Sequence, residues 1–267
     1  IRAPFPYPYR DPCGWCDDGP DFKRYFDFLE MTVSANSSGS LAGVIVEPYQ
    51  GAAGFIFPPR GWLKRLEEWT HANGLLFTLD EVQSSYGRTG RMWALEHEDL
   101  KPDILTIGKA IGCGVPVSAI AATSDVFSCL AKGEMSSTLG GNPVASAAVP
   151  VILDIFEREG LVQRSAEMGA YMMPRLLGIA ERSAHLGEVR GTGLVMGLEF
   201  VKDKDSRTPA PELIKPIITE CANHGLLVGS VGIHSNVIRV APPLVLTREE
   251  ADESLDIMEN VVLGLGE

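Results

Sequence analysis

LLFTLDEVQ, at residues 75–83, is a mostly apolar run that ends in two carboxylates. DILTIGK, at residues 103–109, repeats the pattern with an apolar segment that ends before a lysine. Such short apolar runs, bounded by polar residues, are typical of strands buried on both faces of a parallel or mixed sheet. Ligands bind beyond the carboxyl ends of parallel strands. The two stretches therefore predict that Asp80 and Lys109 share one cleft.

Strands and helices alternate outward from these stretches, with a change of pattern near Gly160. Before it, we expect further strands at 42–47 and 117–122 and helices at 22–34, 61–73 and 143–159. After it, we expect strands at 194–201, 226–231 and 237–240 and helices at 161–185, 212–223 and 248–263. This order predicts an α/β fold, with a large domain at 1–159 built on a mixed, mostly parallel sheet and a small α+β domain at 160–267.

Charge and composition exclude several classes of protein. The net charge is 23 − 35 = −12, and no basic patch of the kind that binds nucleic acid is visible. No apolar run reaches the roughly 18–20 residues that cross a bilayer, and the first residues contain no signal-peptide core. We therefore expect a cytoplasmic protein that binds neither membrane nor nucleic acid.

The five cysteines are scattered, which argues against a disulfide framework and favours a reducing compartment. Cys13 and Cys16 have the spacing of a thioredoxin-type redox motif. They lie in a loop rich in proline, glycine and aspartate, however, whereas that motif follows a strand and opens a helix. No second pair of ligands has zinc spacing, so no metal site is expected.

Lys109 differs from the other seven lysines, which lie in polar or loop-like surroundings. It follows an apolar strand, and the glycines around it would let a bulky group approach the backbone. A desolvated lysine has a lowered pKa and can act as a nucleophile toward a carbonyl. The alternative is a lysine that extends from a strand end into water. For Asp80, the alternative to a catalytic role is a helix N-cap.

Five segments in the same order and spacing resemble the class III aminotransferases, which depend on pyridoxal 5'-phosphate (PLP). The likeness is strongest to 4-aminobutyrate and ω-amino acid aminotransferases. The matching segments are VEPYQG at 46–51, LDEVQSSYGRTG at 79–90, PDILTIGK at 102–109, STLGGNP at 137–143 and NVIRVAPPL at 236–244. They extend over nearly the whole chain, and the resemblance implies the type I fold of PLP-dependent transferases.

The resemblance also implies a role for each cofactor-binding residue. Lys109 would form a Schiff base with PLP and then move a proton between substrate and cofactor. Asp80 would pair with the pyridine nitrogen, Gln83 with the phenolic oxygen, and Val82 would pack on the ring. Thr138 would reach the cofactor phosphate of a neighbouring subunit, which implies a homodimer with shared active sites. The alternative for Thr138 is a cap of the helix that begins at Pro143.

Two further residues would bind the substrate. Arg239 would hold a carboxylate through two parallel hydrogen bonds. Glu47 resembles the family's gate residue, which pairs with that arginine when an ω-amino group enters. The alternative for Arg239 is an ordinary strand-edge arginine, although its apolar neighbours suggest a buried side chain that needs a partner.

The resemblance implies transfer of an amino group from an ω-amino acid or amine to a keto acid. Two alternatives remain open. One is a decarboxylase or lyase of the same family, similar to dialkylglycine decarboxylase. The other is a truncated, non-catalytic fragment, because the family's glycine- and serine-rich phosphate-binding loop has no counterpart before Ala42. The sequence does not identify the amino donor or acceptor.

Overall fold

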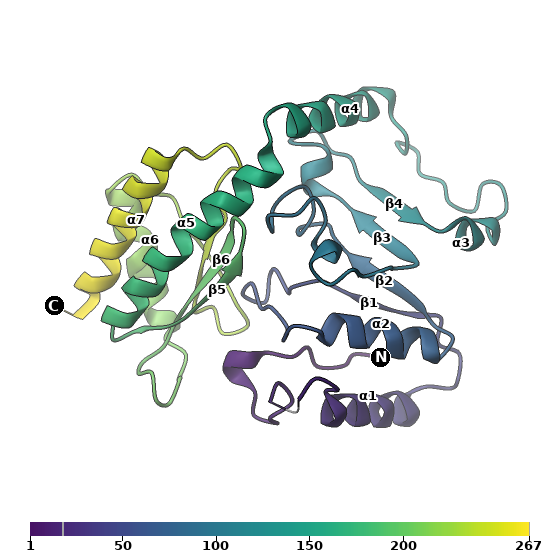
Figure 1. The fold of residues 1–267 in the computed structure, drawn as a ribbon, viewed down its shortest axis with the longest axis horizontal. Coiled ribbons are helices and arrows are strands. Elements are labelled where there is room, and N and C mark those ends of the chain that lie inside the picture. The colour runs from purple at the N-terminus through teal and green to yellow at the C-terminus, as the bar shows by residue number, and fades with distance from the viewer. Residues whose placement is uncertain (18, 267) are drawn as a thin grey trace. The chain divides into compact units, whose positions relative to one another are not determined.

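Residues 1–17 and 19–266 are described by a computed structural model, in which the chain forms two units (Figure 1). The first unit comprises residues 1–48, 57–86 and 93–159. The second comprises residues 49–56, residues 87–92 and the chain from Gly160 onward. The assignment of a cofactor-binding domain to 1–159 and a small domain to 160–267 stays a prediction.

Two half-buried arginine side chains explain why segments 49–56 and 87–92 belong to the second unit. Arg190 donates hydrogen bonds to the carbonyl oxygens of Gly54 and Phe55, at 2.7 and 3.0 Å, and is itself paired with the buried Glu199 at 2.7 Å. Arg88 donates to the carbonyl oxygens of Leu194 and Pro242. These charge-assisted contacts satisfy backbone groups that regular structure leaves without partners.

The first unit is built on a four-stranded sheet with the order β1-β2-β3-β4. The strands are β1 (Gly43–Val46), β2 (Leu76–Asp80), β3 (Ile104–Ile107) and β4 (Ala119–Ala122). β1 is parallel to β2 and β2 is parallel to β3, whereas β4 is antiparallel to β3. The predicted mixed, mostly parallel sheet is therefore confirmed.

Helices α1 (Lys23–Asn36) and α2 (Trp62–Ala72) lie together on one side of this sheet (Figure 1). Their apolar residues form one core with Phe77 and Leu79 of β2; it includes Phe26, Leu29, Trp62, Leu66 and Trp69. Burying a side chain of this size contributes about 1.5–3 kcal/mol. The unit also contains α3 (Ser124–Ser128) and α4 (Pro143–Arg158), and α4 continues through Pro150.

The prediction that the strands of this sheet are buried on both faces is wrong for β1 and β4. Val44 and Val46 of β1 pack against the α1–α2 core, but Ile45 between them is 65% exposed. Three of the four residues of β4 are also exposed. Successive side chains in a strand point to opposite faces, so in β1 one covered face leaves every second residue open to solvent, whereas β4, at the edge of the sheet, is exposed on both faces.

In the second unit, the sheet order is β5-β6-β8-β7, and every pairing is antiparallel. Its strands are β5 (Leu186–Thr192), β6 (Val195–Phe200), β7 (Gly229–Val231) and β8 (Val237–Val240). The sequence did not predict β5, which carries charged and glycine residues instead of an apolar run. β7 is shorter than the predicted strand at 226–231.

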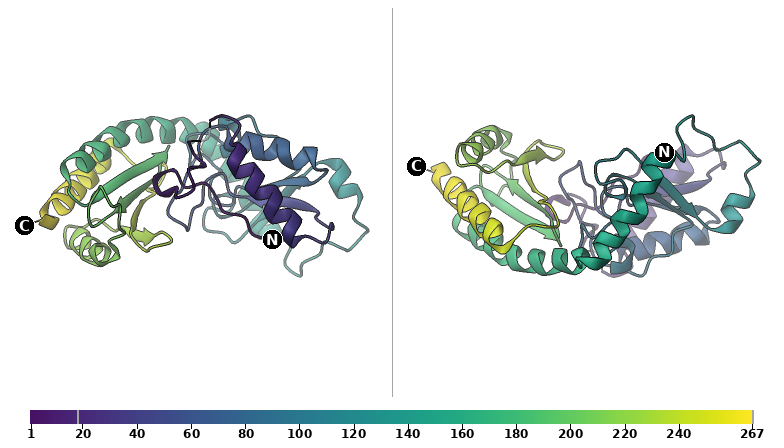
Figure 2. Two further views of the ribbon diagram at one scale, coloured as in Figure 1. Left: turned by 90° about the horizontal axis from the view of Figure 1, so that it is seen from below. Right: turned by 90° about the horizontal axis from the view of Figure 1, so that it is seen from above.

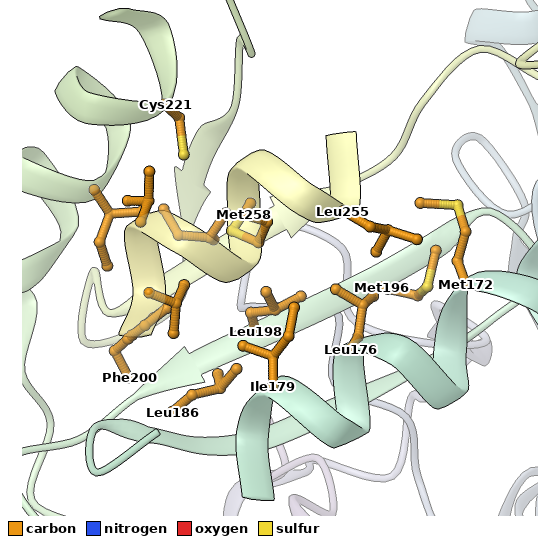
Figure 3. Close-up of a cluster of buried hydrophobic side chains, with 14 of the residues drawn as sticks. Met172, Leu176, Ile179, Leu186, Met196, Leu198, Phe200, Cys221, Leu255 and Met258 are labelled. Atoms are coloured by element: carbon orange, nitrogen blue, oxygen red, sulfur yellow. The ribbon is translucent and has the colours of Figure 1, made fainter. Parts of the chain in front are cut away.

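Helices α5 (Leu161–Arg182), α6 (Ile214–Asn223) and α7 (Arg248–Leu263) lie on one side of this second sheet (Figure 2). Leu176 and Ile179 of α5 meet Leu198 of β6 and Met258 of α7 in a closed apolar core (Figure 3). α7 begins with a capping box in which Thr247 and Glu250 exchange side-chain hydrogen bonds with each other's backbone N–H. Among the described residues, no helix is both long and apolar enough to cross a membrane.

Candidate functional site

Three of the predicted site residues follow neighbouring parallel strands of the first unit. Val46 and Leu79 are partner residues in the sheet, so Glu47 and Asp80 follow matching positions of β1 and β2. Asp80 is in turn the partner of Thr106, three residues before Lys109. The carboxyl ends of β1, β2 and β3 therefore bring two carboxylates and one amine to the same edge of the sheet.

The Asp80 carboxylate is held through one of its two oxygens. Its Oδ1 accepts hydrogen bonds from the backbone N–H of Val82 and from the Thr106 hydroxyl, each at 3.0 Å. No other hydrogen bond to this carboxylate occurs within residues 1–17 and 19–266. Residues 82–89 form turns and not a helix, so the alternative of a helix N-cap is wrong.

Lys109 adopts a left-handed backbone conformation, with φ of 47°, at the start of a short 3-10 helix that ends at Ile111. Non-glycine residues in this region are uncommon and cluster at functional sites. The side chain is exposed, so the prediction of a desolvated amine is wrong. Ile111 and Gly112 are buried, whereas Cys113 and Gly114 beyond them are exposed.

Close packing brings the turn after Asp80 against the backbone before Lys109. A Cβ on Gly108 would lie 3.1 Å from Cγ1 of Val82, so a larger residue at 108 would push Val82 away. Gly108 has extended backbone angles that any residue adopts. Glycine is therefore needed here for the close contact with Val82 and not for its backbone conformation. The strand ends thus place Asp80, Val82 and Lys109 in one neighbourhood.

Glu81 is fully buried beside Asp80 and anchors this turn. Its carboxylate accepts hydrogen bonds from the Ser84 hydroxyl at 2.6 Å and from the backbone N–H groups of Ala94 and Leu95 at 3.0 and 2.8 Å. Burial raises the pKa of the Glu81 carboxyl above its ordinary value of 4.5, although these three donors act against it. The sequence reasoning gave Glu81 no role.

Replacing Glu81 with Gln should lower the free energy of unfolding by about 1–3 kcal/mol near neutral pH, because the amide cannot accept from all three donors. The pH dependence of the free energy of unfolding should change too. The raised pKa of Glu81 means that the folded state binds the proton more tightly, so its contribution to stability falls as pH rises above 4.5. Denaturant titrations from acid to neutral pH measure the free energy of unfolding at each pH. Between pH 4.5 and neutral pH, the Glu81 carboxyl should add a downward slope in wild type that Glu81→Gln lacks.

The control is Glu68→Gln, at an exposed carboxylate, which should keep the wild-type slope. Equal slopes in wild type and Glu81→Gln would contradict the raised pKa of Glu81.

The remaining predicted residues of the first unit lie in different settings. Glu47 and Gln83 are half-buried. Thr138 is exposed in a turn before α4, and no hydrogen bond joins its side chain to Asp80 or Lys109 in the described part of the chain. Asn142 is the residue that caps α4, accepting from the N–H groups at 144 and 145. The alternative of Thr138 as the cap of that helix is therefore wrong.

In the second unit, Arg239 lies on β8 between two glycines of neighbouring strands. Its partners are Gly197 on β6 and Gly229 on β7. A Cβ on Gly229 would lie 2.8 Å from Nε of Arg239, so the arginine side chain occupies the space that this glycine leaves. Arg239 is exposed, which corrects the prediction of a buried side chain that needs a partner. The structure does not place Glu47 and Arg239, which belong to different units, relative to each other.

Arg239 also contributes to the wall of a cavity of about 530 Å³ within the second unit. The other walls are largely apolar and include Met172, Leu176, Leu226, Val228, Pro242 and Leu255. Ligand cavities typically measure roughly 300–1,000 Å³ and combine apolar walls with a few polar groups. An arginine beside apolar walls suits a carboxylate on a short aliphatic chain.

The alternative redox site finds little support in the structure. Asp11 accepts hydrogen bonds from the N–H groups of Cys13 and Cys16. Burial and the neighbouring Asp11 raise the pKa of the Cys16 thiol to about 12, whereas reactive thiols have lowered values. Within the described residues, no group of three or more potential ligands could hold a metal ion.

Thr106 is the second residue that the sequence reasoning missed. It interrupts an otherwise apolar strand, and this polar residue was a signal that could have been used. Its side chain contacts Asp80, and its carbonyl oxygen accepts from the N–H of Glu81 at 3.0 Å. Finding that contact required the register between β2 and β3, which the sequence did not supply.

Comparison with known proteins identifies the family. A family model described as aminotransferase class-III matches residues 4–262. A 4-aminobutyrate aminotransferase from Mycobacterium leprae is 36% identical over 98% of this chain and 58% of its own length. An alanine/serine racemase from Pyrococcus horikoshii is also 36% identical, over 97% of this chain and 55% of its own.

A solved structure agrees with these sequences. It is an amine transaminase from an uncultivated Pseudomonas species in the PLP-bound (internal aldimine) form, 34% identical with a TM-score of 0.88, and the match covers 97% of this chain and 60% of that one. The chain thus spans about three fifths of the length of the relatives it matches. From residue 4 to residue 262, in sequence and in fold, it belongs to the class III aminotransferase family.

Proposed function

We propose that this chain carries the catalytic lysine of a PLP-dependent aminotransferase, which moves an amino group from an ω-amino acid or amine to a keto acid. The observation that carries the proposal is the edge of the first sheet, where Asp80 ends β2 and Lys109 follows the adjacent parallel strand β3. Family membership and a PLP-bound relative support it.

The residues at this edge fit PLP. When bound, PLP withdraws electrons from the substrate carbon that carries the amino group. Lys109 supplies an accessible primary amine that would attach the cofactor's aldehyde carbon with loss of water, and that amine, once released, would move a proton at the substrate carbon. Asp80 would keep a proton on the ring nitrogen through its second oxygen, Oδ2. The absent side chain at Gly108 leaves Val82 room beside the lysine.

Three further assignments complete the cofactor site as we propose it. Val82 would pack on one face of the ring and Gln83 would donate to its phenolic oxygen. Thr138 would bind the phosphate in the active site of a partner subunit, and its exposure before α4 is compatible with that role. The functional protein would then be a homodimer with shared active sites. A reducing, cytoplasmic location is part of this proposal.

Arg239 would bind the substrate carboxylate, with Glu47 as its gate partner when an ω-amino group enters. The exposed side chain of Arg239, which lies between two glycines, supports its role in binding the carboxylate. The apolar cavity wall favours acids with a short aliphatic chain.

Substitution of Arg239 with Lys should weaken keto-acid binding at least about tenfold, because lysine loses the planar fork that makes two parallel hydrogen bonds. Gly229→Ala should weaken it in the same direction, since its Cβ would displace the guanidinium. Binding isotherms with one keto acid and one amine that has no carboxylate would measure both. The control is Gly178→Ala in α5, where an added Cβ meets nothing within 4 Å. Equal losses for the two ligands would contradict the role of Arg239.

Racemisation is a second candidate, favoured by the 36% identical alanine/serine racemase. Removal of a proton from the substrate carbon by Lys109 would begin both reactions, and they differ in where the proton returns. Decarboxylation and elimination remain further alternatives within the family.

Incubating the purified chain with PLP, an amino donor and a keto acid tests the proposal. An aminotransferase should form a visible absorption band with PLP and then produce a new amino acid from the keto acid. A racemase should instead invert a chiral amino acid without consuming the keto acid. Absence of any band would support the non-catalytic fragment and contradict the proposed function.

A further inference from the structure

Thr106 and Asp80 form a side-chain pair that the family resemblance did not point to. They are partner residues in adjacent parallel strands, so their side chains lie on the same face of the sheet. The Thr106 hydroxyl donates to Oδ1 of Asp80 at 3.0 Å. The Val82 N–H donates to the same oxygen at the same distance.

These two donors come from different parts of the chain. Val82 lies two residues further along the chain, so its N–H makes a local turn with the carboxylate. Thr106 belongs to the next strand, whose position is fixed by three partner pairs with β2. Two hydrogen bonds to one oxygen restrict both side-chain torsions of Asp80, because rotation about either bond would break at least one of them.

We propose that Thr106 is a positioning residue that fixes the Asp80 carboxylate so that Oδ2 faces the ring nitrogen of the cofactor. The inference rests on the proposed function for the identity of that nitrogen, but the positioning itself is a property of the free chain. The backbone of Thr106 adds to it, since its carbonyl oxygen accepts from the Glu81 N–H and holds the residue after Asp80.

Three variants separate positioning from a general effect on the strand. Thr106→Val replaces the hydroxyl with a methyl group of similar size and keeps a β-branched residue. Thr106→Ser keeps the hydroxyl and should restore the contact. Thr78→Val is the matched control: Thr78 is also half-buried, on the same face of β2 two residues before Asp80, and its hydroxyl makes no hydrogen bond with the described residues.

The first measurement needs no cofactor. Crystal structures of the PLP-free wild type, Thr106→Ser and Thr78→Val should each show one Asp80 rotamer, in which Oδ1 accepts from both the hydroxyl of residue 106 and the Val82 N–H. Thr106→Val should show a second rotamer. A single, unchanged Asp80 rotamer in Thr106→Val would overturn the inference.

The second measurement compares the rate of the half-reaction with one amino donor and the dissociation constant for PLP. Thr106→Val should react about tenfold more slowly with little change in the dissociation constant, as expected for loss of one hydrogen bond to a charged group that acts on the rate, whereas Thr106→Ser should stay within about twofold of wild type in both. Equal rates in Thr106→Val and wild type would also overturn the inference. If the rotamer changes as expected while the wild type itself does not bind PLP, the proposed function fails and the positioning by Thr106 stands.

Discussion

Lys109→Ala should abolish covalent capture of PLP by this chain. Lys109 follows β3 at the edge that carries Asp80, and it is the one lysine whose backbone is held in the left-handed region in the described chain. Alanine removes the amine that would attach the aldehyde carbon, so the visible band of the wild-type complex should be missing. The φ of 47° is unfavourable for lysine and alanine alike, so the change should leave the free energy of unfolding largely unaltered.

The control for this variant is Lys101→Ala. Lys101 lies near the start of β3, is 77% exposed, and its ammonium makes only a 3.9 Å ion pair with Asp99. It should keep the band and its intensity. A full-strength band in Lys109→Ala would show that cofactor attachment does not depend on Lys109. Loss of the band in Lys101→Ala would show that the effect is not specific to Lys109.

Asp80→Asn should slow turnover by several orders of magnitude in the active protein while it leaves cofactor binding largely in place. The asparagine oxygen can still accept from the Val82 N–H and the Thr106 hydroxyl, so the local geometry should survive. A neutral amide cannot keep a proton on the ring nitrogen, and each ~1.4 kcal/mol lost from the transition state costs about tenfold in rate.

Half-reaction rates with a single amino donor, measured beside the PLP dissociation constant, test this expectation. The surface variant Asp99→Asn, at a carboxylate that is 90% exposed, should match wild type in both. Near-normal rates in Asp80→Asn would mean that Asp80 serves only to shape the turn after β2. A loss of PLP affinity as large as the loss of rate would point to a binding role alone.

Much of the fold could be predicted because the apolar runs are short and well bounded. Residues 75–79 and 103–107 have the length and composition of buried strands, and both lie in the sheet of the first unit. The helix at Arg248–Leu263 was predictable from its capping box and its apolar spacing. The family, too, could be identified from five motifs in order.

Other features depend on contacts that no local pattern encodes. Ile45 is apolar and looks buried in sequence, but which face of a strand is covered depends on the elements packed there. Segments 49–56 and 87–92 join the second unit through Arg190 and Arg88, whose carbonyl partners are distant in sequence. Lys109 is exposed although Gly108 and Ile111 beside it are buried, and this local difference is not encoded in the apolar run before it.

Some residues of the candidate site could likewise be found from the sequence, and others could not. Asp80 and Lys109 were predictable because each directly follows an apolar run. Thr106 and Glu81 were not, because their roles come from the register of β2 and β3 and from a buried turn that reaches Ala94 and Leu95. The roles of all the site residues stay predictions: Lys109, Asp80, Val82, Gln83, Thr138, Glu47 and Arg239.

The most direct test is to locate the cofactor on the chain. The wild-type protein would be incubated with PLP, treated with borohydride to make the covalent bond permanent, digested and mapped by mass spectrometry. The account predicts a single modified lysine, at position 109, among the eight in the sequence. Modification spread over Lys101, Lys132 and the other surface lysines, or no modification at 109, would contradict it.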